Sequence, residues 1–321
     1  MPRVTDFNTS PSLAFVFPGQ GSQSVGMLAE LSELHPGVRA TFEEASEGAG
    51  VDLWALSQAG PEEQLNRTEY TQPALLAAGV AVWRLWQQQG GAQPSVLAGH
   101  SLGEYAALVA AQAISLRNAA HLVRIRGQLM QAAAPAGTGA MAAVLGAEDA
   151  LVLEVCEAVS ASAVVVPANY NSPRQIVIGG HAAAVDAALA MLAERGVRKT
   201  VKLAVSVPSH TPLMRDAANR LADTMAGMDW RLPVLPVVQN VDAQVHDSID
   251  AIREALVRQL YLPVQWTGCV QALAARGITR IGECGPGKVL AGLAKRIDKS
   301  LEARALGSVG DFEAAIEEWT A

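Results

Sequence analysis

Cysteine and charge are scarce in this 321-residue chain, and each scarcity excludes a class of protein. The three cysteines, Cys156, Cys269 and Cys284, lie too far apart to suggest a disulfide framework or a paired-cysteine metal site. Charged residues make up 17% and the formal net charge is -7, so general binding of nucleic acid or anionic membranes is not expected. No apolar run approaches the ~20 residues that span a bilayer, and residues 1–12 lack the apolar stretch of a signal peptide. We therefore expect a cytoplasmic protein.

Hydrophobic residues make up 50% of the chain, enough for a sizeable core. The short apolar run at residues 13–17 ends at Pro18-Gly19 and predicts a strand that is buried on both faces. Residues 72–89 predict a helix with Pro73 near its first turn. A strand at residues 96–100 and a helix from residue 101 to about 113 follow. This order is typical of a mostly parallel α/β sheet.

The pattern changes from residue 137 onward. The expected strands cover residues 141–145, 163–167, 175–178 and 199–205, the expected helices cover 148–159 and 182–195, and a polar turn is expected at 169–174. This β-α-β-β-α-β order is that of a ferredoxin-like unit. We expect residues 137–205 to form a small inserted domain, and residues 1–136 and 206–321 to form the large domain.

G-H-S-L-G at residues 99–103 matches the G-x-S-x-G pattern of a nucleophile elbow. The motif lies between an expected strand and an expected helix, which is the context that an elbow requires. Ser101 would then expose its hydroxyl at a helix N-terminus, where backbone N–H groups favour a developing oxyanion. The alternative is a serine that only caps the helix.

A serine nucleophile needs a base, and histidine suits that role best near neutral pH. Among six histidines, His210 is the candidate because it follows a strand end in a proline-bearing loop, where α/β folds present catalytic groups. His100 adjoins Ser101, but its side chain is expected to point away from the hydroxyl. The alternative for His210 is a loop histidine whose hydrogen bonds are satisfied.

Arg126 lies in the apolar stripe of a helix expected over residues 116–131, between Leu122 and Met130. A buried guanidinium is costly unless an anion pairs with it. The pattern favours an internal Asp or Glu as that anion. A substrate carboxylate held by a bidentate fork is the alternative.

Motifs for metals and phosphates have little support. No HExxH, calcium-loop or cysteine–histidine zinc spacing occurs, so metal chemistry is not expected. Residues 282–288 fit G-x-x-x-x-G-K, but Val289 follows where a phosphate loop needs Ser or Thr. A structural strand-turn-helix is expected there.

Five motifs follow one another along the chain: P-G-Q-G-S-Q at 18–23, G-H-S-L-G-E-Y at 99–105, R-G at 126–127, V-P-S-H at 207–210 and G-P-G-K at 285–288. In this order they resemble the motifs of malonyl-CoA:acyl carrier protein transacylases. Residues 137–143 and 256–266 match as well, and the resemblance runs from about residue 13 to 297. It implies an α/β-hydrolase-like large domain with an inserted ferredoxin-like small domain. It is closest to the stand-alone bacterial enzyme of fatty-acid synthesis.

The resemblance implies roles for the matching positions. Ser101 would be the nucleophile and His210 the general base, with the main-chain carbonyl of Gln265 orienting the histidine. Backbone N–H groups of Gln20 and Leu102 would hold the oxyanion. Arg126 would bind the malonyl carboxylate in place of an internal partner. The other residues expected to contact substrate are Met130, Asn169, Asn171 and His100.

The implied reaction is a ping-pong transfer of malonyl from coenzyme A to the phosphopantetheine thiol of acyl carrier protein, through a malonyl-serine ester. The coenzyme A thioester is a substrate, and no cofactor is expected. An acidic carrier protein would need a local basic patch, for which the candidates are Arg195, Arg198, Lys199 and Lys202. The alternative for this cluster is a solvated face.

Two other functions fit fewer of the motifs. A serine thioesterase or esterase would use the same elbow, but Arg126 and the turn at residues 18–23 argue against it. A non-catalytic module that binds carrier protein is a third possibility, and an intact Ser101 and His210 argue against that.

Overall fold

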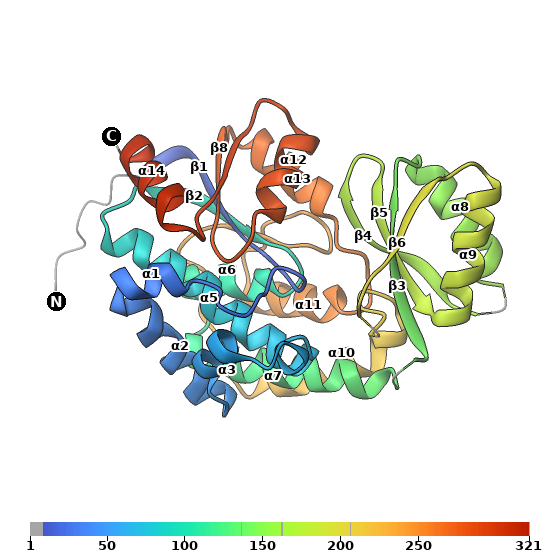
Figure 1. Cartoon of the computed structure of the whole chain (residues 1–321), viewed down its shortest axis with the longest axis horizontal. Coiled ribbons are helices and arrows are strands. Elements are labelled where there is room, and N and C mark those ends of the chain that lie inside the picture. Colours follow the sequence, from blue (N-terminus) through green and yellow to red (C-terminus); the bar gives the residue numbers. More distant parts are fainter. Residues whose placement is uncertain (1–8, 136, 162, 206, 321) are drawn as a thin grey trace.

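Two β-sheets of different kinds organise the chain (Figure 1). The computed structural model describes residues 9–135, 137–161, 163–205 and 207–320. The larger sheet has five parallel strands in the order β7-β2-β1-β8-β9. The smaller sheet has four antiparallel strands in the order β4-β5-β3-β6.

The parallel sheet is the middle layer of the larger part of the molecule. Its strands are β1 (Thr9–Phe17), β2 (Gln93–Gly99), β7 (Val237–Val238), β8 (Arg280–Glu283) and β9 (Glu302–Ala305). The helices before the smaller sheet are α1 (Ala29–Leu34), α2 (Pro36–Ala49), α3 (Leu53–Ala59), α4 (Glu62–Leu65), α5 (Thr68–Gln88), α6 (Gly103–Ala110) and α7 (Leu116–Ala133). Those after it are the 3-10 turn at Pro212–Met214, α10 (Arg215–Ala226), α11 (Ile249–Gln259), α12 (Trp266–Ala275), α13 (Val289–Ile297) and α14 (Val309–Trp319).

Strand β1 is buried on both faces, as its continuous apolar run predicts. Leu13, Phe15 and Phe17 belong to a core cluster that includes side chains of α2, α5, α6 and α7. Ala14 and Val16 belong to a second cluster with α12 and α13 on the opposite face. Alternate side chains of a strand point to opposite faces, so one short strand packs against both helical layers.

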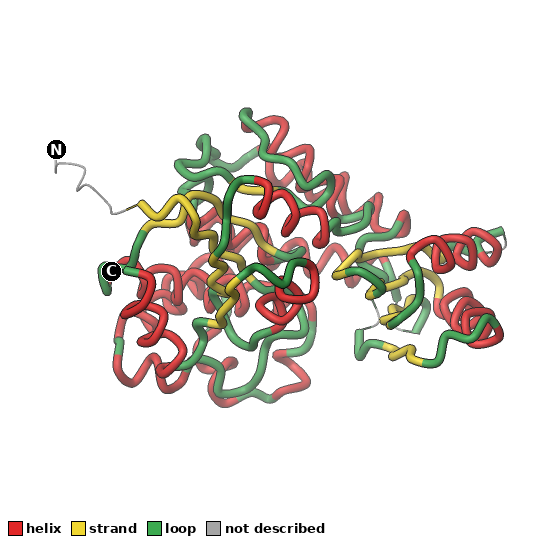
Figure 2. Tube along the Cα trace, turned by 90° about the horizontal axis from the view of Figure 1, so that it is seen from above, coloured by secondary structure: helices red, strands yellow, loops and turns green. Residues whose placement is uncertain are grey.

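The smaller sheet has the ferredoxin-like order expected from the sequence. Its elements are β3 (Gly139–Leu145), α8 (Asp149–Val159), β4 (Val165–Ser172), β5 (Gln175–His181), α9 (Ala182–Glu194) and β6 (Lys199–Lys202). Both helices lie on the face of this sheet that points away from the parallel sheet (Figures 1 and 2). The expected boundary residues 136 and 206 lie outside the described residues, so the division at 137–205 stays a prediction.

The strand expected at residues 199–205 is shorter in the structure, because β6 ends at Lys202. Two other expected elements differ more. The helix predicted from residue 72 begins at Thr68, so Pro73 lies inside α5; proline is commonest in a first turn, and that preference placed the start too late. The polar turn predicted at residues 169–174 is mostly strand, because β4 continues to Ser172. The hairpin with β5 explains this, since Asn169, Tyr170 and Ser172 pair with Val177, Ile176 and Gln175 and leave only residues 173–174 as the turn. The Tyr170 N–H also donates to the Val264 carbonyl (2.9 Å).

That contact also joins the two parts of the molecule. The Val264 N–H donates to the carbonyl of Ala168 (2.9 Å), and the Thr267 hydroxyl donates to the carbonyl of Tyr170 (3.1 Å). Strand β4 is therefore tied to the segment that leads into α12. Asn169, between these bonds, is held at the edge of the larger part. Across the described residues, none of the helices has the length and hydropathy needed to cross a membrane.

Candidate active site

Ser101 lies at a sharp turn between β2 and α6. Its φ is +51°, in the left-handed region that non-glycine residues rarely adopt. The flanking glycines make this turn possible: a Cβ on Gly99 would lie 2.0 Å from the Gly103 carbonyl, and one on Gly103 would lie 1.9 Å from the Phe17 oxygen. Leu102, not Ser101, is the N-cap of α6. The capping alternative is therefore wrong, and the turn has the geometry of a nucleophile elbow.

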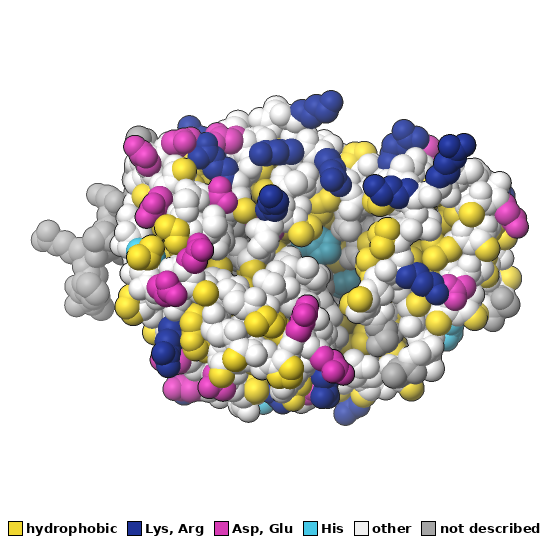
Figure 3. All heavy atoms as spheres, in the orientation of Figure 1, with side chains coloured by type: hydrophobic (Ala, Val, Ile, Leu, Met, Phe, Trp, Pro, Cys, Tyr) yellow, Lys and Arg dark blue, Asp and Glu magenta, His cyan; other side chains and the backbone are white. Residues whose placement is uncertain are grey.

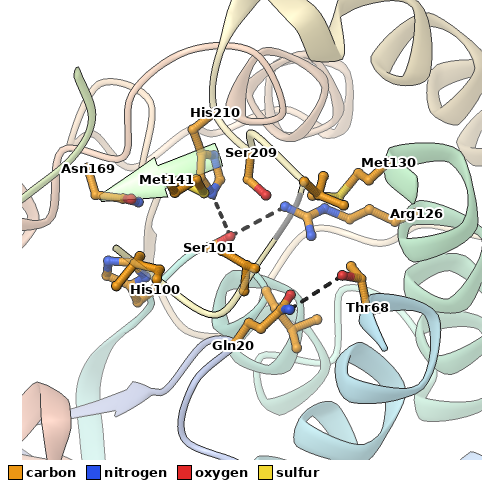
Figure 4. Close-up of a pocket in the computed structure, with 14 residues that line it drawn as sticks. Gln20, Thr68, His100, Ser101, Arg126, Met130, Met141, Asn169, Ser209 and His210 are labelled. Carbon is orange, nitrogen blue, oxygen red and sulfur yellow. Dashed lines mark hydrogen bonds between the residues drawn. The ribbon is translucent and has the colours of Figure 1, made fainter. Parts of the chain in front are cut away.

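His210 is hydrogen-bonded to Ser101. Its Nε2 lies 2.8 Å from Ser101 Oγ (Figure 4). Its Nδ1–H donates to the main-chain carbonyl of Gln259 (2.6 Å). This bond leaves the Nε2 lone pair facing the serine hydroxyl, as a general base requires. The His210 backbone N–H also donates to the carbonyl of Leu260 (2.9 Å), so the end of α11 holds the residue twice.

The carbonyl expected to orient the histidine was the wrong one. Gln265 does not contact His210; its carbonyl accepts from the Cys269 N–H (2.8 Å) in the first turn of α12. Gln259 is the last residue of α11, and the last carbonyls of a helix have no intrahelical donor. Gln265 begins a helix, so its carbonyl is used within that helix.

The surroundings of His210 keep its imidazole neutral. Burial, with help from the nearby Arg126 guanidinium and His100, lowers the pKa of His210 to about 3. A histidine with that pKa carries a free lone pair throughout the physiological range. It can accept the Ser101 proton without first losing one of its own.

Arg126 projects from α7 into the same site and is 1% exposed. Its guanidinium donates to Gln72 Oε1 (2.9 Å), Gln259 Oε1 (3.0 Å) and Ser101 Oγ (3.4 Å). No Asp or Glu among the described residues forms an ion pair with it, so the internal partner that the pattern favoured is absent there. Its Nε has no hydrogen-bond partner in the described chain. A buried cation held only by neutral groups is suited to an incoming anion.

One pocket contains most of the predicted residues. Gln20, Leu102, Met130, Asn169 and His100 line it together with Ser101, His210 and Arg126. Figure 4 shows Asn169 reaching in from the smaller part, opposite Arg126. Figure 3 shows histidine side chains in a hollow between the two parts of the molecule. Residues from both parts of the molecule therefore surround Ser101.

His100 and Asn171 are hydrogen-bonded to each other at the side of this pocket. His100 Nε2 lies 2.8 Å from Asn171 Oδ1. The His100 ring turns away from Ser101, as predicted (Figure 4). Asn171 does not line the pocket, and it contacts the site through His100.

Sequence reasoning missed Gln72, Asn240, Gln259 and Glu104. Asn240 Oδ1 accepts from the Ser101 N–H (2.6 Å), and its Nδ2 donates to the Gly99 carbonyl (2.6 Å), so this side chain braces the elbow. Gln72 holds Arg126 from α5. A polar residue within an apolar stripe, as Gln72 is in α5, is the signal that identifies such a partner.

Two of the four cations in the expected basic patch form ion pairs. Arg195 forms an ion pair with Glu154 (2.8 Å), and Lys202 forms one with Asp186. Arg198 and Lys199 are exposed, and neither forms an ion pair with another described residue. Figure 3 shows Lys and Arg side chains along the upper edge of the hollow on both sides.

Comparison with known proteins agrees with this geometry. The model of the acyl transferase domain family matches residues 14–302. A malonyl CoA-acyl carrier protein transacylase of Escherichia coli K12 is 54% identical over 95% of this chain and 98% of its own length. A protein of the same name from Bacillus subtilis is 42% identical over 95% of this chain and 96% of its own length.

Solved structures extend the likeness to the whole fold. The malonyl-CoA:acyl carrier protein transacylase of Xanthomonas oryzae pv. oryzae has a TM-score of 0.96 and 76% identity, covering 97% of this chain and 99% of that one. A malonyl-transacylase in complex with a type II PKS acyl-carrier protein has a TM-score of 0.94 and 50% identity, covering 95% and 99%. On the serine–histidine geometry, the family match and these relatives, the chain belongs to the malonyl-CoA:acyl carrier protein transacylases of the acyl transferase family.

Proposed function

We propose that this chain transfers the malonyl group from malonyl-CoA to the phosphopantetheine thiol of acyl carrier protein, with Ser101 as the nucleophile. The observation that carries this proposal is the position of Arg126. Its guanidinium lies 3.4 Å from Ser101 Oγ and has no described carboxylate partner. A malonyl thioester has a carboxylate close to its reacting carbonyl, so Arg126 can hold one while Ser101 attacks the other.

The first half-reaction forms a malonyl-serine ester. Ser101 Oγ attacks the thioester carbonyl while His210 Nε2 accepts the hydroxyl proton, and the tetrahedral intermediate collapses with loss of the coenzyme A thiolate. His210 returns the proton to the departing sulfur. The Gln259 carbonyl supports the imidazolium that forms transiently, since it already accepts from Nδ1–H.

The second half-reaction reverses these roles. The carrier thiol gives its proton to His210 and attacks the ester carbonyl, and the Ser101 oxygen leaves and is reprotonated. Both halves pass through an oxyanion, for which we propose the backbone N–H groups of Gln20 and Leu102. Both residues line the pocket, and neither N–H has an acceptor within the described chain. The position of Leu102 at the N-terminus of α6 adds a favourable dipole.

A direct assay that separates the two possible products tests this function. Malonyl-CoA and phosphopantetheinylated carrier protein are incubated with the enzyme, and malonyl-carrier and free malonate are quantified separately. We expect malonyl-carrier as the main product. Free malonate at the rate of thioester loss would identify a thioesterase instead. We propose no cofactor, because a serine and a neutral histidine carry both half-reactions.

We also propose that the carrier protein docks beside Arg198 and Lys199. Both side chains flank the start of β6 on the smaller part, and Leu203, directly after that strand, lines the active-site pocket. A positive patch at this edge would attract an acidic carrier although the whole chain is negative. The location that we propose is the cytoplasm, since all three thiols are buried and unpaired.

Charge reversal tests the docking surface. In Arg198→Glu/Lys199→Glu, we expect the KM for carrier protein to rise about tenfold at low salt and the difference to shrink at high salt. Acylation by malonyl-CoA should not change. The matched control is Arg220→Glu/Arg231→Glu, two exposed cations that form no ion pair with another described residue and do not line the active-site pocket. An equal rise in KM in both double variants would contradict a specific surface.

The low pKa of His210 predicts an unusual pH profile. Acylation of Ser101 needs neutral His210, and the neutral form prevails above a pKa of about 3. We expect the rate of acylation by p-nitrophenyl acetate, a small uncharged probe, to stay flat from pH 7 down to pH 5. An enzyme whose histidine had the ordinary pKa of about 6.5 would lose most of its acylation rate over this range. Circular dichroism at each pH separates loss of base from unfolding.

The same shift in the pKa of His210 lowers the stability of the folded chain in acid. The unfolded chain binds a proton at His210 below about pH 6.5, whereas the folded chain does not bind it until about pH 3. The contribution of His210 to stability is therefore lost as the pH falls through this window.

The acylation profile can contradict the low pKa of His210. A decline in the acylation rate with a midpoint near pH 6.5, in enzyme that stays folded, would do so.

A further inference from the structure

A fully buried carboxylate lies one helical turn beyond the nucleophile and has no role in the mechanism above. Glu104 is 0% exposed, in the first turn of α6. Three N–H groups converge on it: Gln239 Nε2 donates to Oε1 (3.2 Å), and the Asn240 backbone N–H (2.8 Å) and Gln259 Nε2 (3.0 Å) donate to Oε2. No ion pair to Glu104 forms within the described residues. Neutral donors alone therefore satisfy this carboxylate.

Gln259 connects Glu104 to the whole catalytic group. Its Nε2 donates to Glu104 and to the Ser101 carbonyl (3.0 Å), and its Oε1 accepts from Arg126 (3.0 Å). Its main-chain carbonyl accepts from His210 Nδ1–H (2.6 Å). One residue thus contacts the nucleophile's peptide, the base and the cation. A small turn of its side chain would disturb both Ser101 and Arg126.

Asn240 forms a second connection. Its backbone N–H donates to Glu104, while its side chain bonds to the backbone on both sides of the elbow, at Ser101 N–H and the Gly99 carbonyl (2.6 Å each). The strained backbone of Ser101 therefore depends on an asparagine that Glu104 holds in place. Strain of this kind persists only where the surroundings enforce it.

Burial of Glu104 works against its charge. Desolvation raises the pKa of Glu104 to about 7, although the three hydrogen bonds oppose the shift. A well-packed apolar side chain would avoid this cost. The carboxylate is, however, the only kind of side chain of this length that accepts hydrogen bonds on two oxygens without needing to donate one. That property is what the three converging donors require.

We propose that Glu104 is a positioning residue for acyl transfer: it fixes Gln259 and Asn240, and through them holds Ser101, His210 and Arg126 in one arrangement. The proposal rests on the transfer function only for its malonyl readout. Glu104 itself does not line the active-site pocket. The consequence of the proposal is that loss of the acceptor lowers the rate of chemistry, beyond any loss of folded protein.

The first test removes the acceptor without shortening the side chain. In Glu104→Met, we expect kcat per folded site to fall roughly ten- to a hundredfold, since displacement of reacting groups by about 1 Å costs up to about 100-fold. Glu104→Gln should restore most of the rate, because one amide oxygen still accepts from Asn240 and Gln259. Gln239 Oε1, which has no partner among the described residues, can accept from the new amide if the Gln239 amide turns over.

A matched buried glutamate separates positioning from stability. Glu283 is also 0% exposed, its Oε2 accepts from the Ala291 N–H (2.8 Å) of α13, and it does not line the active-site pocket. Glu283→Met should lower the melting temperature and leave kcat per folded site within about twofold. If Glu104→Met fails to fold, Glu104→Asp beside Glu283→Asp makes the same comparison. The aspartates keep the charge and draw the oxygens back by one carbon–carbon bond.

The path through Gln259 is tested by a double-mutant cycle. Gln259→Met removes the side-chain groups and keeps the main-chain carbonyl. We expect Glu104→Met/Gln259→Met to be slowed by much less than the product of the two single effects. Multiplicative effects, or unchanged kcat in folded Glu104→Met and Glu104→Asp, would overturn the proposal. Acylation by p-nitrophenyl acetate is measured in parallel, so an enzyme that acylates but does not transfer malonyl would fail the proposed function alone.

Discussion

Replacement of Ser101 by alanine is expected to lower malonyl transfer by at least about 10,000-fold, the scale seen when the nucleophile of a serine–histidine group is removed. Ser101 Oγ is the atom bonded to His210 Nε2 at 2.8 Å and lies beside the Arg126 guanidinium. The side chain projects from a turn that its neighbours enforce, and alanine keeps that turn. The variant should therefore fold and bind malonyl-CoA but form no ester. Initial rates with saturating carrier protein give the comparison.

The pocket contains a second serine that serves as the control. Ser209 lines the same pocket, directly before His210. Ser209→Ala should still form the malonyl-enzyme, whereas Ser101→Ala should not. A malonyl adduct on Ser101→Ala, or loss of the adduct in Ser209→Ala alone, would show that Ser101 is not the nucleophile.

Arg126→Ala is expected to reverse the preference for a charged acyl group. Removal of two charge-assisted hydrogen bonds, each worth about 1.5–3 kcal/mol, should lower kcat/KM for malonyl-CoA by roughly 100- to 10,000-fold. Acetyl-CoA has no carboxylate to lose, so its kcat/KM should change far less. Arg126→Lys should lie between, because lysine keeps the charge but cannot form the planar fork. Competition between the two thioesters measures the preference directly.

Arg124 is the natural control for that substitution. It lies on the same helix, pairs with Glu69 (3.8 Å) and stacks over Tyr70, and it does not line the pocket. Arg124→Ala should leave the malonyl preference intact. If Arg126→Ala kept the wild-type ratio of malonyl to acetyl transfer, the carboxylate would be recognised elsewhere.

The fold could be predicted where local pattern and burial agree. The apolar run of β1 and the β-α-β-β-α-β order of the smaller sheet each reflect a single physical constraint, and both predictions are confirmed. The turn expected at residues 169–174 was wrong because β4 and β5 stay paired up to Ser172 and Gln175, so the hairpin turns within two residues. Composition records that Asn169 is polar, but not that its backbone pairs with Val177 in a sheet.

Site residues could likewise be predicted only where a local signal marks them. Ser101 and His210 could be found because an elbow and a loop histidine carry local signals. Gln259 could not, since its importance comes from where α11 ends relative to His210, and the resemblance indicated Gln265 six residues later. Arg126 illustrates the limit: its partners Gln72 and Gln259 lie 54 and 133 residues away in sequence. Pattern alone therefore favoured an internal carboxylate.

The central claim is a malonyl-serine intermediate that a carrier thiol discharges. The most direct measurement is intact mass spectrometry after brief incubation with malonyl-CoA, followed by phosphopantetheinylated carrier protein in one half of the sample. We predict one malonyl adduct on the wild-type chain, located at Ser101, which disappears from the enzyme and reappears on the carrier. An adduct that is lost equally fast without carrier, or turnover with no adduct at any time, would contradict the account.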